Sequence, residues 1–254
     1  MPTQKTIIKV ENLTAAYQDN VVLDDISFNV HQGKVFVILG GSGSGKSTLL
    51  KHMIGLYHPA KGRILIDGDD IATAEGEQRH KILSKFGVAY QSGALFGSMT
   101  IKQNIRLVLE EFTSLPDDAM DWISLSRLKL VGLEDDADKL PSELSGGMKK
   151  RAAIARAMAL EPEIIFLDEP SAGLDPVTSA DLDDLIIDLS QSLGITFVVV
   201  SHELSSIFSI ADEVIMLCGD TKKIIAQGKP EDLKNNSDIP FVRLFFNRQS
   251  KNVN

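Results

Sequence analysis

The chain has 254 residues, of which 43% are hydrophobic and 24% charged, and its formal net charge is −9. This composition is ordinary for a globular protein, and the length allows one large α/β domain or two small ones. The acidic balance argues against nucleic acid as the main partner, because nucleic-acid-binding proteins usually carry a basic surface. The only cysteine, Cys218, cannot form an internal disulfide, which is compatible with a reducing compartment.

No segment of the sequence is predicted to cross a membrane. The longest apolar runs, such as residues 35–39 and 195–200, are far shorter than the roughly 20 residues that a membrane-spanning helix needs. Residues 1–11 are too polar for a secretory signal peptide. If the protein works at a membrane, we therefore expect another chain to supply the membrane part.

Three apolar runs rich in β-branched residues predict buried strands of a parallel sheet, at residues 35–39, 164–167 and 195–200. A helical pattern follows each predicted strand. Repetition of strand and helix is typical of a doubly wound α/β core. The three predicted helices cover residues 46–55, 175–193 and 204–210.

Two other stretches depart from this repetition. Residues 6–11 and 21–30 alternate between apolar and polar and flank the turn-like Gln18-Asp19-Asn20, which predicts an antiparallel hairpin-like element. Between about 97 and 160 the apolar residues follow helical spacing and strand signals vanish. We therefore predict one composite domain over residues 1–254, with a helical subdomain inserted into its α/β core.

Residues 40–47 match G-x-x-x-x-G-K-[ST], the Walker A phosphate loop. Glycines allow successive N–H groups to form an anion nest, and the helix that follows points its positive end at the phosphates. Lys46 is expected to reach the β- and γ-phosphates, and Ser47 to bind Mg²⁺. A flexible Gly/Ser turn is the alternative, but the strand before the loop and the helix after it favour a nucleotide site. The predicted nucleotide-binding residues here are Gly40, Gly41, Ser42, Gly43, Ser44, Gly45, Lys46, Ser47 and Thr48.

The predicted strand at 164–167 runs into two acids, Asp168 and Glu169. Carboxylates at the carboxyl end of a parallel strand are expected beside the phosphate loop of the neighbouring strand. Asp168 is then a candidate Mg²⁺ ligand. Glu169 is a candidate general base for the attacking water, a role worth about 10²–10⁴ in rate. The alternative is an acidic strand end that caps the next element.

Further motifs, in the same order along the chain, resemble those of ABC ATPases. Leu144-Ser145-Gly146-Gly147-Met148 resembles the LSGGQ signature and lies 23 residues before Asp168 (168 − 145). The resemblance covers nearly the whole chain. It implies a P-loop NTPase (RecA-like) core with an antiparallel β subdomain and an inserted α-helical subdomain. The other correspondences are Ser171-Ala172-Gly173-Leu174-Asp175 with the D-loop, His202 with the switch histidine, Gln91 with the Q-loop glutamine, and Tyr17 with an adenine-stacking aromatic.

The resemblance implies an ATPase that uses ATP and Mg²⁺. Each residue alone has a structural alternative: Tyr17 as a surface aromatic, Gln91 as a solvated loop residue, and His202 as a helix cap. The glycine pair of the signature could form a plain turn. Their joint order favours the functional interpretation. The implied catalytic residues are Lys46, Gln91, Glu169 and His202, and the implied metal ligands are Ser47, Gln91 and Asp168.

The signature motif predicts a second anion site. Ser145 can cap a helix that begins near Met148, while Gly146 and Gly147 expose its N–H groups. One chain cannot easily bring both anion sites to one γ-phosphate, whereas a head-to-tail dimer can. The resemblance accordingly implies a homodimer in which Ser145, Gly146 and Gly147 act in trans and Asp175 belongs to the D-loop. Further positive charge near that end is expected from Lys149, Lys150 and Arg151.

Met148 stands where the family most commonly has glutamine. Methionine lacks the amide donor, but the serine and the two glycines supply the main contacts of the signature. We therefore expect ATP binding and hydrolysis to persist with methionine at this position.

Within the family, the chain resembles the ATPase subunits of Mce/Mla-type lipid transporters. This resemblance implies phospholipid transport that maintains outer-membrane lipid asymmetry, with the chain peripheral on the cytoplasmic face of the bacterial inner membrane. The implied partners are an integral-membrane permease, an MCE-domain substrate-binding protein and a STAS-domain subunit, with no nucleic acid. The resemblance to these lipid-transport ATPases rests on four segments of the sequence. They are Met148, Gln91-Ser92-Gly93-Ala94-Leu95-Phe96 with Met99 and Asn104, Ser201-His202-Glu203-Leu204 with Ile207, and Ser209-Ile210-Ala211-Asp212.

Two apolar segments are candidate docking surfaces. Residues 92–100, with Phe96 and Met99, suit a groove for a permease coupling helix, and ordinary core packing is the alternative. The tail at 236–254 is strongly apolar over residues 239–246. Because chain ends usually fray unless they are tied down, this tail is expected to dock on a neighbouring subunit or on its own domain.

Other functions share parts of this pattern. A cell-division or solute-importer ATPase would carry the same motifs with another permease, and an ATPase of iron–sulfur cluster assembly would carry them without a membrane partner. A DNA-repair or translation ABC protein is disfavoured, because the sequence has no coiled-coil insertion, second cassette or basic excess. The sequence carries no signal for the transported lipid, because the ATPase does not touch the lipid.

Overall fold

The computed structural model describes residues 5–18 and 20–248. The chain divides into two compact units: unit 1 joins Met1–Ala74 to Val198–Asn254, and unit 2 is the continuous segment Glu75–Phe197. Asp19 of the predicted turn and residues 249–254 of the predicted tail lie outside the described residues. Among the described helices, none has both the length and the apolar character that crossing a membrane would require.

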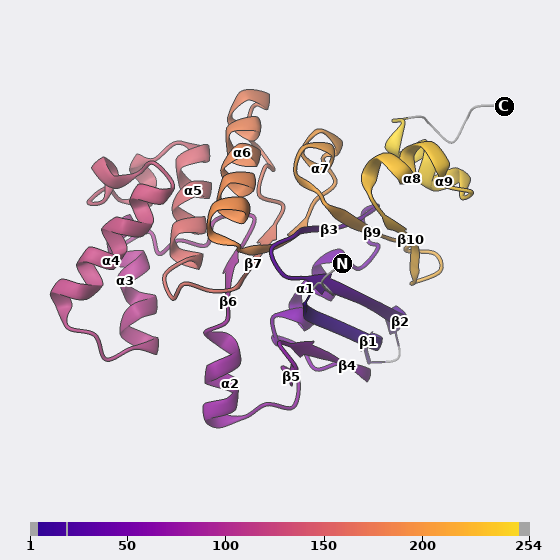
Figure 1. Cartoon of the computed structure of the whole chain (residues 1–254), viewed down its shortest axis with the longest axis horizontal. Coiled ribbons are helices and arrows are strands. Elements are labelled where there is room, and N and C mark those ends of the chain that lie inside the picture. Colours follow the sequence, from indigo (N-terminus) through magenta and orange to yellow (C-terminus); the bar gives the residue numbers. More distant parts are fainter. Residues whose placement is uncertain (1–4, 19, 249–254) are drawn as a thin grey trace. The chain divides into compact units, whose positions relative to one another are not determined.

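Unit 1 contains an antiparallel sheet in the order β2-β1-β4-β5 (Figure 1). The predicted hairpin is confirmed, but its two strands are longer than the alternation indicated. The pairing of β1 with β2 shifts register at several points, including between Val10 and Leu13. Each bulge inserts an extra residue and breaks the two-residue period, so the alternating pattern ends before the strand does. The strands are β1 (Thr6–Tyr17), β2 (Asn20–His31), β4 (Lys61–Ile66) and β5 (Asp69–Asp70).

The other strands of unit 1 surround β3 (Val35–Gly40), whose six residues are all buried. β3 pairs in parallel with β9 (Glu213–Leu217), and β10 (Ile224–Gly228) pairs antiparallel with β9. Ser201, directly after β8 (Thr196–Val200), donates its N–H to the Ile38 carbonyl at 3.3 Å. A strand covered on both faces shows no alternation, which is why β3 reads as a continuous apolar run. The helices of unit 1 are α1 (Lys46–Met53), α7 (Leu204–Ile210), α8 (Pro230–Asn236) and α9 (Pro240–Phe246).

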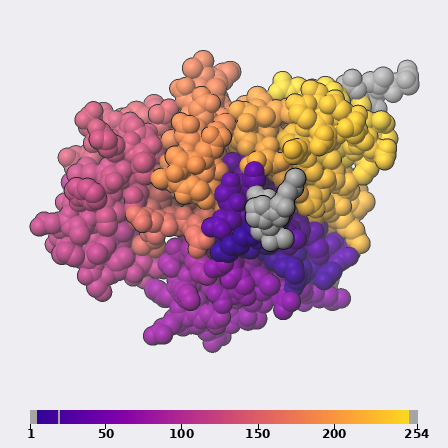
Figure 2. Space-filling model, viewed as in Figure 1, coloured from indigo at the N-terminus to yellow at the C-terminus, as the bar shows by residue number. Residues whose placement is uncertain are grey.

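The apolar tail folds as α9 and packs on its own unit. Val242 and Phe246 are buried, and the Phe246 ring lies 5.7 Å from the ring of Phe208 in α7. Lys234 of α8 places its ammonium 5.0 Å from the centre of the same Phe208 ring. Figure 2 shows α8 and α9, in yellow, lying against the adjoining gold elements of the same unit. Packing on the chain's own domain, one of the two alternatives, therefore accounts for the buried side of α9.

Unit 2 joins a parallel strand pair to a group of helices. β6 (Phe86–Ala89) pairs in parallel with β7 (Ile164–Asp168), and the Thr196 N–H at the start of β8 donates to the Glu163 carbonyl at 3.0 Å. Residues 97–160, all of which the structure describes, contain helices and turns but no strand, as predicted. The remaining elements of unit 2 are α2 (Gly76–Leu83), α3 (Ile101–Phe112), α4 (Asp117–Leu130), η1 (Glu134–Asp136), η2 (Pro141–Glu143), α5 (Gly146–Ala157) and α6 (Pro176–Leu193).

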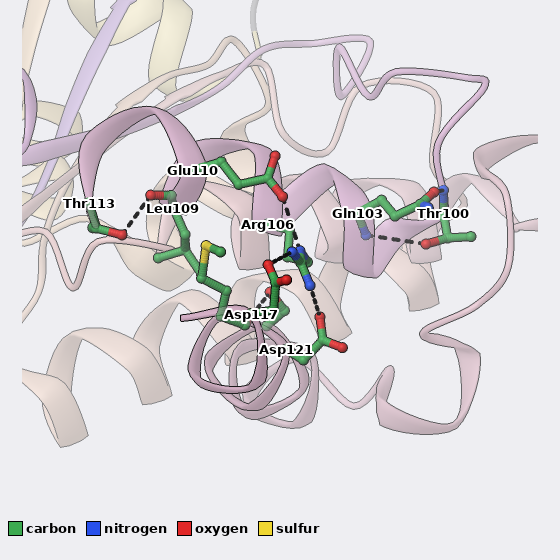
Figure 3. A network of polar contacts seen from close by, with 10 residues as sticks. Thr100, Gln103, Arg106, Leu109, Glu110, Thr113, Asp117 and Asp121 are labelled. Atoms are coloured by element: carbon green, nitrogen blue, oxygen red, sulfur yellow. Dashed lines mark hydrogen bonds and ion pairs between the residues drawn. The ribbon is translucent and has the colours of Figure 1, made fainter. Parts of the chain in front are cut away.

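An ion-pair network joins α3 to α4 (Figure 3). The guanidinium of Arg106 donates to Glu110 one turn along α3 at 3.1 Å. It also donates to Asp117 at 2.6 Å and Asp121 at 2.7 Å, both on α4. Its hydrogen bonds to these carboxylates, first of all to that of Asp121, raise the pKa of Arg106 above its ordinary value. Because the network is open to solvent, it orients the two helices more than it stabilises them.

Asn104 of α3 is completely buried and anchors the loop before that helix. Its side-chain oxygen accepts the Phe96 N–H at 2.8 Å. Its amide nitrogen donates to the carbonyls of Phe96 and Met99, both at 3.2 Å, and of Thr100 at 3.0 Å. Residues 96–100 are thereby tied to the first turn of α3. In the sequence, Asn104 stands out only as part of a family resemblance, whereas in the structure it has a physical role as the anchor of this loop.

We predict that Asn104→Ala lowers the free energy of unfolding by about 2–3 kcal/mol, because it removes a buried amide and leaves the part-buried Phe96 N–H and Met99 carbonyl without this partner. Urea denaturation of the purified chain measures this quantity. Ser98→Ala, an exposed change in the same loop, should stay within about 0.5 kcal/mol of wild type. An equally small effect of Asn104→Ala would contradict the anchoring role.

Candidate functional site

The predicted phosphate loop connects the end of β3 to the start of α1, as expected. Gly40 is closely packed: a Cβ there would lie 2.6 Å from the Leu217 carbonyl oxygen. Gly45, the N-cap of α1, has a φ of 97°, and a Cβ there would lie 2.6 Å from Cδ2 of Leu23. A Cβ at Gly41 or Gly43 would meet nothing within 4 Å. The chain's own packing thus requires glycine at both ends of the loop, while the middle of the loop is open.

Two polar groups of this loop suit a bound phosphate. The Lys46 ammonium donates to the carbonyls of Gly40 at 2.9 Å and Gly41 at 3.0 Å, which holds it over the loop. The Ser44 hydroxyl is buried and has no hydrogen-bond partner among the described residues. Buried hydroxyls are normally satisfied, so an unpaired one inside a loop at a helix N-terminus fits an anion.

Tyr17, the last residue of β1, is 44% exposed and contacts a second aromatic that the sequence analysis missed. The rings of Tyr17 and Tyr57 pack edge to face with centroids 5.7 Å apart. Tyr57 in turn lies 5.7 Å from the buried His52 ring of α1, and burial lowers the pKa of His52. Tyr57 follows the helix after the phosphate loop, a position that could have signalled it. Base stacking on Tyr17 stays a prediction.

His202 lies beyond the end of β8, on the exposed surface. The hydrogen bond from the Ser201 N–H to the Ile38 carbonyl places it alongside the last part of β3, the strand that leads into the phosphate loop. The helix-cap alternative for His202 is wrong, because the N-cap of α7 is Glu203. The position is compatible with the switch-histidine role, which stays a prediction.

In unit 2, Asp168 and Glu169 end β7 next to the end of β6. The ladder pairs Ala89 with Leu167, so Gln91 and Glu169 follow the two strands at the same edge. Glu169 has a φ of 49°, in the left-handed region that only glycine adopts without strain. This conformation costs about 1–2 kcal/mol, and such strain clusters at functional sites. The general-base role of Glu169 stays a prediction.

Lys150 of α5 holds these two strand ends together. Its ammonium donates to the Gln91 carbonyl, and to the Glu169 carbonyl at 3.2 Å. Burial lowers the pKa of Lys150, and the charges of Asp168 and Glu169 oppose that shift. The expectation that Lys150 adds charge at the signature end of α5 is therefore wrong, because its side chain points to the strand ends instead.

The signature motif and the D-loop contact each other within one chain. Ser145 is the N-cap of α5 and accepts the Met148 N–H at 3.2 Å, so the predicted cap is confirmed and the helix begins at Gly146. A Cβ on Gly147 would lie 2.4 Å from Cγ2 of Thr178. Asp175, the N-cap of α6, accepts from the Thr178 hydroxyl at 2.5 Å, and this bond lowers the pKa of Asp175.

A second basic residue of α5, Arg156, supports the chain after Gln91. Its guanidinium donates to the carbonyls of Gly93 at 3.1 Å and Ala94 at 2.6 Å. Both residues have positive φ, 76° for Gly93 and 46° for Ala94. Lys150 and Arg156 were not predicted for these roles. They are two of the four long cations in a helix whose other residues are small or apolar, and this contrast is their signal in the sequence.

We predict that Gly147→Ala destabilises unit 2 by about 1–3 kcal/mol, because the added Cβ overlaps the Thr178 methyl group. Thr178→Ser removes that methyl group and keeps the hydroxyl that Asp175 accepts. The double variant Gly147→Ala/Thr178→Ser should recover most of the loss, and Thr178→Ser alone serves as the control. Thermal and urea unfolding measure all four proteins. If the serine gives no recovery, the contact is not the cause.

Comparison with known proteins agrees with this arrangement. A family model described as ABC transporter matches residues 23–172. The chain is 40% identical over 240 residues to the probable ribonucleotide transport ATP-binding protein mkl of Mycobacterium leprae, covering 94% of the chain and 68% of that protein. It is 40% identical over 239 residues to the intermembrane phospholipid transport system ATP-binding protein MlaF of Escherichia coli K12, covering 94% of the chain and 88% of that protein.

Solved structures are similar as well. That of cbiO1 from Clostridium perfringens, described as part of the ABC transporter complex cbiONQ, matches with a TM-score of 0.83 and 33% identity over 92% of each chain. A dimeric post-hydrolysis state of the ATP-binding cassette MJ0796 with ADP and phosphate matches with a TM-score of 0.77 and 29% identity, over 87% of this chain and 98% of that one. This chain belongs to the ABC transporter family as an ATP-binding subunit that hydrolyses ATP.

Proposed function

We propose that this chain is the ATPase of an Mce-type intermembrane phospholipid transporter. The observation that carries this proposal is the match to proteins named MlaF, of which the chain covers 88% in Escherichia coli and 90% in Haemophilus influenzae. The mycobacterial relatives, named for ribonucleotide transport, are matched over 66–68% of their length. Phospholipid is therefore the favoured substrate class, and ribonucleotide is the alternative.

In this proposal the phosphate loop binds ATP together with Mg²⁺. The open loop, the Lys46 ammonium and the Ser44 hydroxyl support the phosphate site. Hydroxyl, carboxylate and amide oxygens of Ser47, Asp168 and Gln91 are the ligand types that Mg²⁺ prefers. Among the described residues, no three His, Cys, Asp or Glu side chains are grouped to hold a metal. Phosphate and water oxygens would then complete the shell, and the ion would neutralise phosphate charge.

Glu169 acts on the attacking water in the proposed reaction. The water oxygen bonds to the γ-phosphorus, the bond from that phosphorus to the bridging oxygen of ADP breaks, and the Glu169 carboxylate accepts the water proton. The left-handed φ of Glu169 supports this role, because backbone strain of this kind clusters at functional sites. Gln91 and His202 complete the catalytic set, as sensors of the γ-phosphate.

The proposed active form is a head-to-tail homodimer. The N-terminus of α5 presents Ser145 and Gly146 on the exposed surface of unit 2, where the phosphates of a second copy could be bound. The dimeric cassette with ADP and phosphate, a structural relative of this chain, supports the arrangement. Each ATP would then lie between the phosphate loop of one subunit and Ser145, Gly146 and Gly147 of the other.

The proposed partners are a permease, an MCE-domain substrate-binding protein and a STAS-domain subunit, with the chain on the cytoplasmic face of the inner membrane. Phe96 is 52% exposed in the loop that Asn104 anchors, which supports a permease-docking surface there and disfavours core packing for this side chain. A cell-division or solute-importer ATPase, or one of iron–sulfur assembly, would share the catalytic residues but not this lipid-transport complex.

We predict that Glu169→Gln traps an ATP-bound dimer, because the amide cannot accept the water proton while the phosphate contacts remain. Size-exclusion chromatography with light scattering, with Mg-ATP and with Mg-ADP, measures the oligomeric state. The dimer should appear with ATP alone. A variant that stays monomeric at saturating ATP would contradict the composite sites.

The complex itself tests the transport function. Affinity purification of the chain from its native membranes should recover a permease and an MCE-domain protein together with bound phospholipid, identified by mass spectrometry. Phe96→Ala should lower permease recovery about tenfold, a loss of about 1.4 kcal/mol of binding. Trp122→Ala, an exposed aromatic on α4, is the control. Recovery of ribonucleotide without lipid, or of no membrane protein, would contradict the proposal.

A further inference from the structure

The side chain of Lys150 connects the helix that carries the signature motif to two catalytic segments of the same chain. Lys150 lies five residues after the N-cap Ser145 (150 − 145), on the second turn of α5. Its ammonium donates to the carbonyl of Gln91, just after β6, and to that of Glu169, just after β7. One cation on α5 therefore contacts the backbone of both strand ends.

The same helix also forms hydrogen bonds with the segment after Gln91. Arg156 donates to the carbonyls of Gly93 and Ala94. A Cβ at Gly93 would lie 3.5 Å from the Lys149 carbonyl oxygen and 3.7 Å from Cβ of Ala153, so this backbone packs directly on α5. Because two charged donors and close packing hold the segment, its backbone is expected to move with α5 as one body.

At its other end, α5 presents the signature. Ser145 caps the helix, and Gly147 packs so tightly on Thr178 that an added Cβ would overlap the methyl group. Thr178 in turn donates its hydroxyl to Asp175 of the D-loop. One short helix therefore carries both the signature, at its N-terminus, and Lys150, which contacts the backbone of Glu169.

A charged side chain is needed for this connection. The Lys150 ammonium is half-buried, and its desolvation is offset by two carbonyl acceptors and by the nearby charges of Asp168 and Glu169. Glu169 also holds a strained backbone conformation, which persists only where surrounding contacts enforce it. A neutral side chain of similar length would fill the space without holding either carbonyl.

We propose that Lys150 is a positioning residue that couples the two ATP sites of the dimer. This inference rests on the proposed head-to-tail arrangement, in which the signature of a subunit faces the ATP bound to its partner. Gln91 and Glu169 of that same subunit serve its own ATP. When the signature binds the partner's ATP, the position of α5 fixes the backbone of Glu169 and Gln91 through Lys150. ATP binding at one site therefore favours the active geometry at the other.

The dependence of ATPase rate on ATP concentration tests the coupling. The full chain is assayed in its purified transporter complex as wild type, Lys150→Met, Lys150→Arg and the control Lys129→Met, which removes an exposed lysine of α4. Wild type and control should give a Hill coefficient that approaches the number of sites, two. Lys150→Met should bring it to about one, and Lys150→Arg should retain most of the cooperativity because it keeps charge and donors.

Binding of a non-hydrolysable ATP analogue to the isolated subunit separates coupling from damage to the site. Its Kd should change less than about twofold in Lys150→Met, because the phosphate loop is intact. If Lys150→Met fails to fold, Lys150→Gln replaces it, with the same expected loss of cooperativity. A Lys150→Met protein that loses kcat but keeps the wild-type Hill coefficient would overturn the coupling role.

The dimer and the coupling can fail separately. Glu169→Gln that remains monomeric with ATP would overturn the proposed dimer, and the coupling with it. If Glu169→Gln dimerises with ATP while Lys150→Met remains as cooperative as wild type, only the coupling role is overturned. ATP-dependent dimerisation of Glu169→Gln, together with lost cooperativity in Lys150→Met and retained cooperativity in Lys150→Arg, supports both.

Discussion

The site depends on how the backbone turns where buried strands end. β3 leads into a loop whose ends accept only glycine, because a Cβ at Gly40 or Gly45 would overlap atoms 2.5–2.6 Å away. β7 leads into Glu169, whose φ of 49° lies in the left-handed region. Gly40, with a φ of 155°, and Glu169 thus both have a positive φ where a buried strand ends. Backbone groups and short side chains can then approach a phosphate that a bulky side chain would exclude.

In unit 2, helix α5 contacts the segments that follow β6 and β7. Its first residues carry the signature, and the half-buried Lys150 and Arg156 hold carbonyls of the segments that follow β6 and β7. Donors on long side chains satisfy carbonyls that strand pairing leaves unpaired, which is the general requirement for buried backbone groups. The helix that begins with the signature motif, Gln91 and Glu169 are therefore parts of one hydrogen-bonded assembly. Helix α5 thus carries the signature motif and, through Lys150 and Arg156, also holds the backbone of the segments after β6 and β7.

Buried and exposed polar groups contribute differently around the helical segment. Arg106 pairs with three carboxylates in solvent, where screening and side-chain entropy leave little net stability. The buried side chain of Asn104 makes four part-buried hydrogen bonds, so its loss costs more. The loop that presents Phe96 is thus fixed by one buried amide, whereas α3 and α4 are joined by solvent-exposed ion pairs.

Local pattern was enough to determine much of this protein. The Gly/Lys spacing of residues 40–47, the acidic end of the strand at 164–167 and the cap at Ser145 are properties of short segments, because strand, loop and cap chemistry act over a few residues. The predicted helices begin within one residue of α1, α6 and α7 for the same reason. What only the tertiary structure decided involves residues far apart: the length of β1 and β2 beyond their bulges, and the aromatic pair of Tyr17 and Tyr57. The direction of the Lys150 side chain is of this kind too, since a lysine on a helix can reach in several directions and burial, with the carbonyls 59 and 19 residues away, selects one.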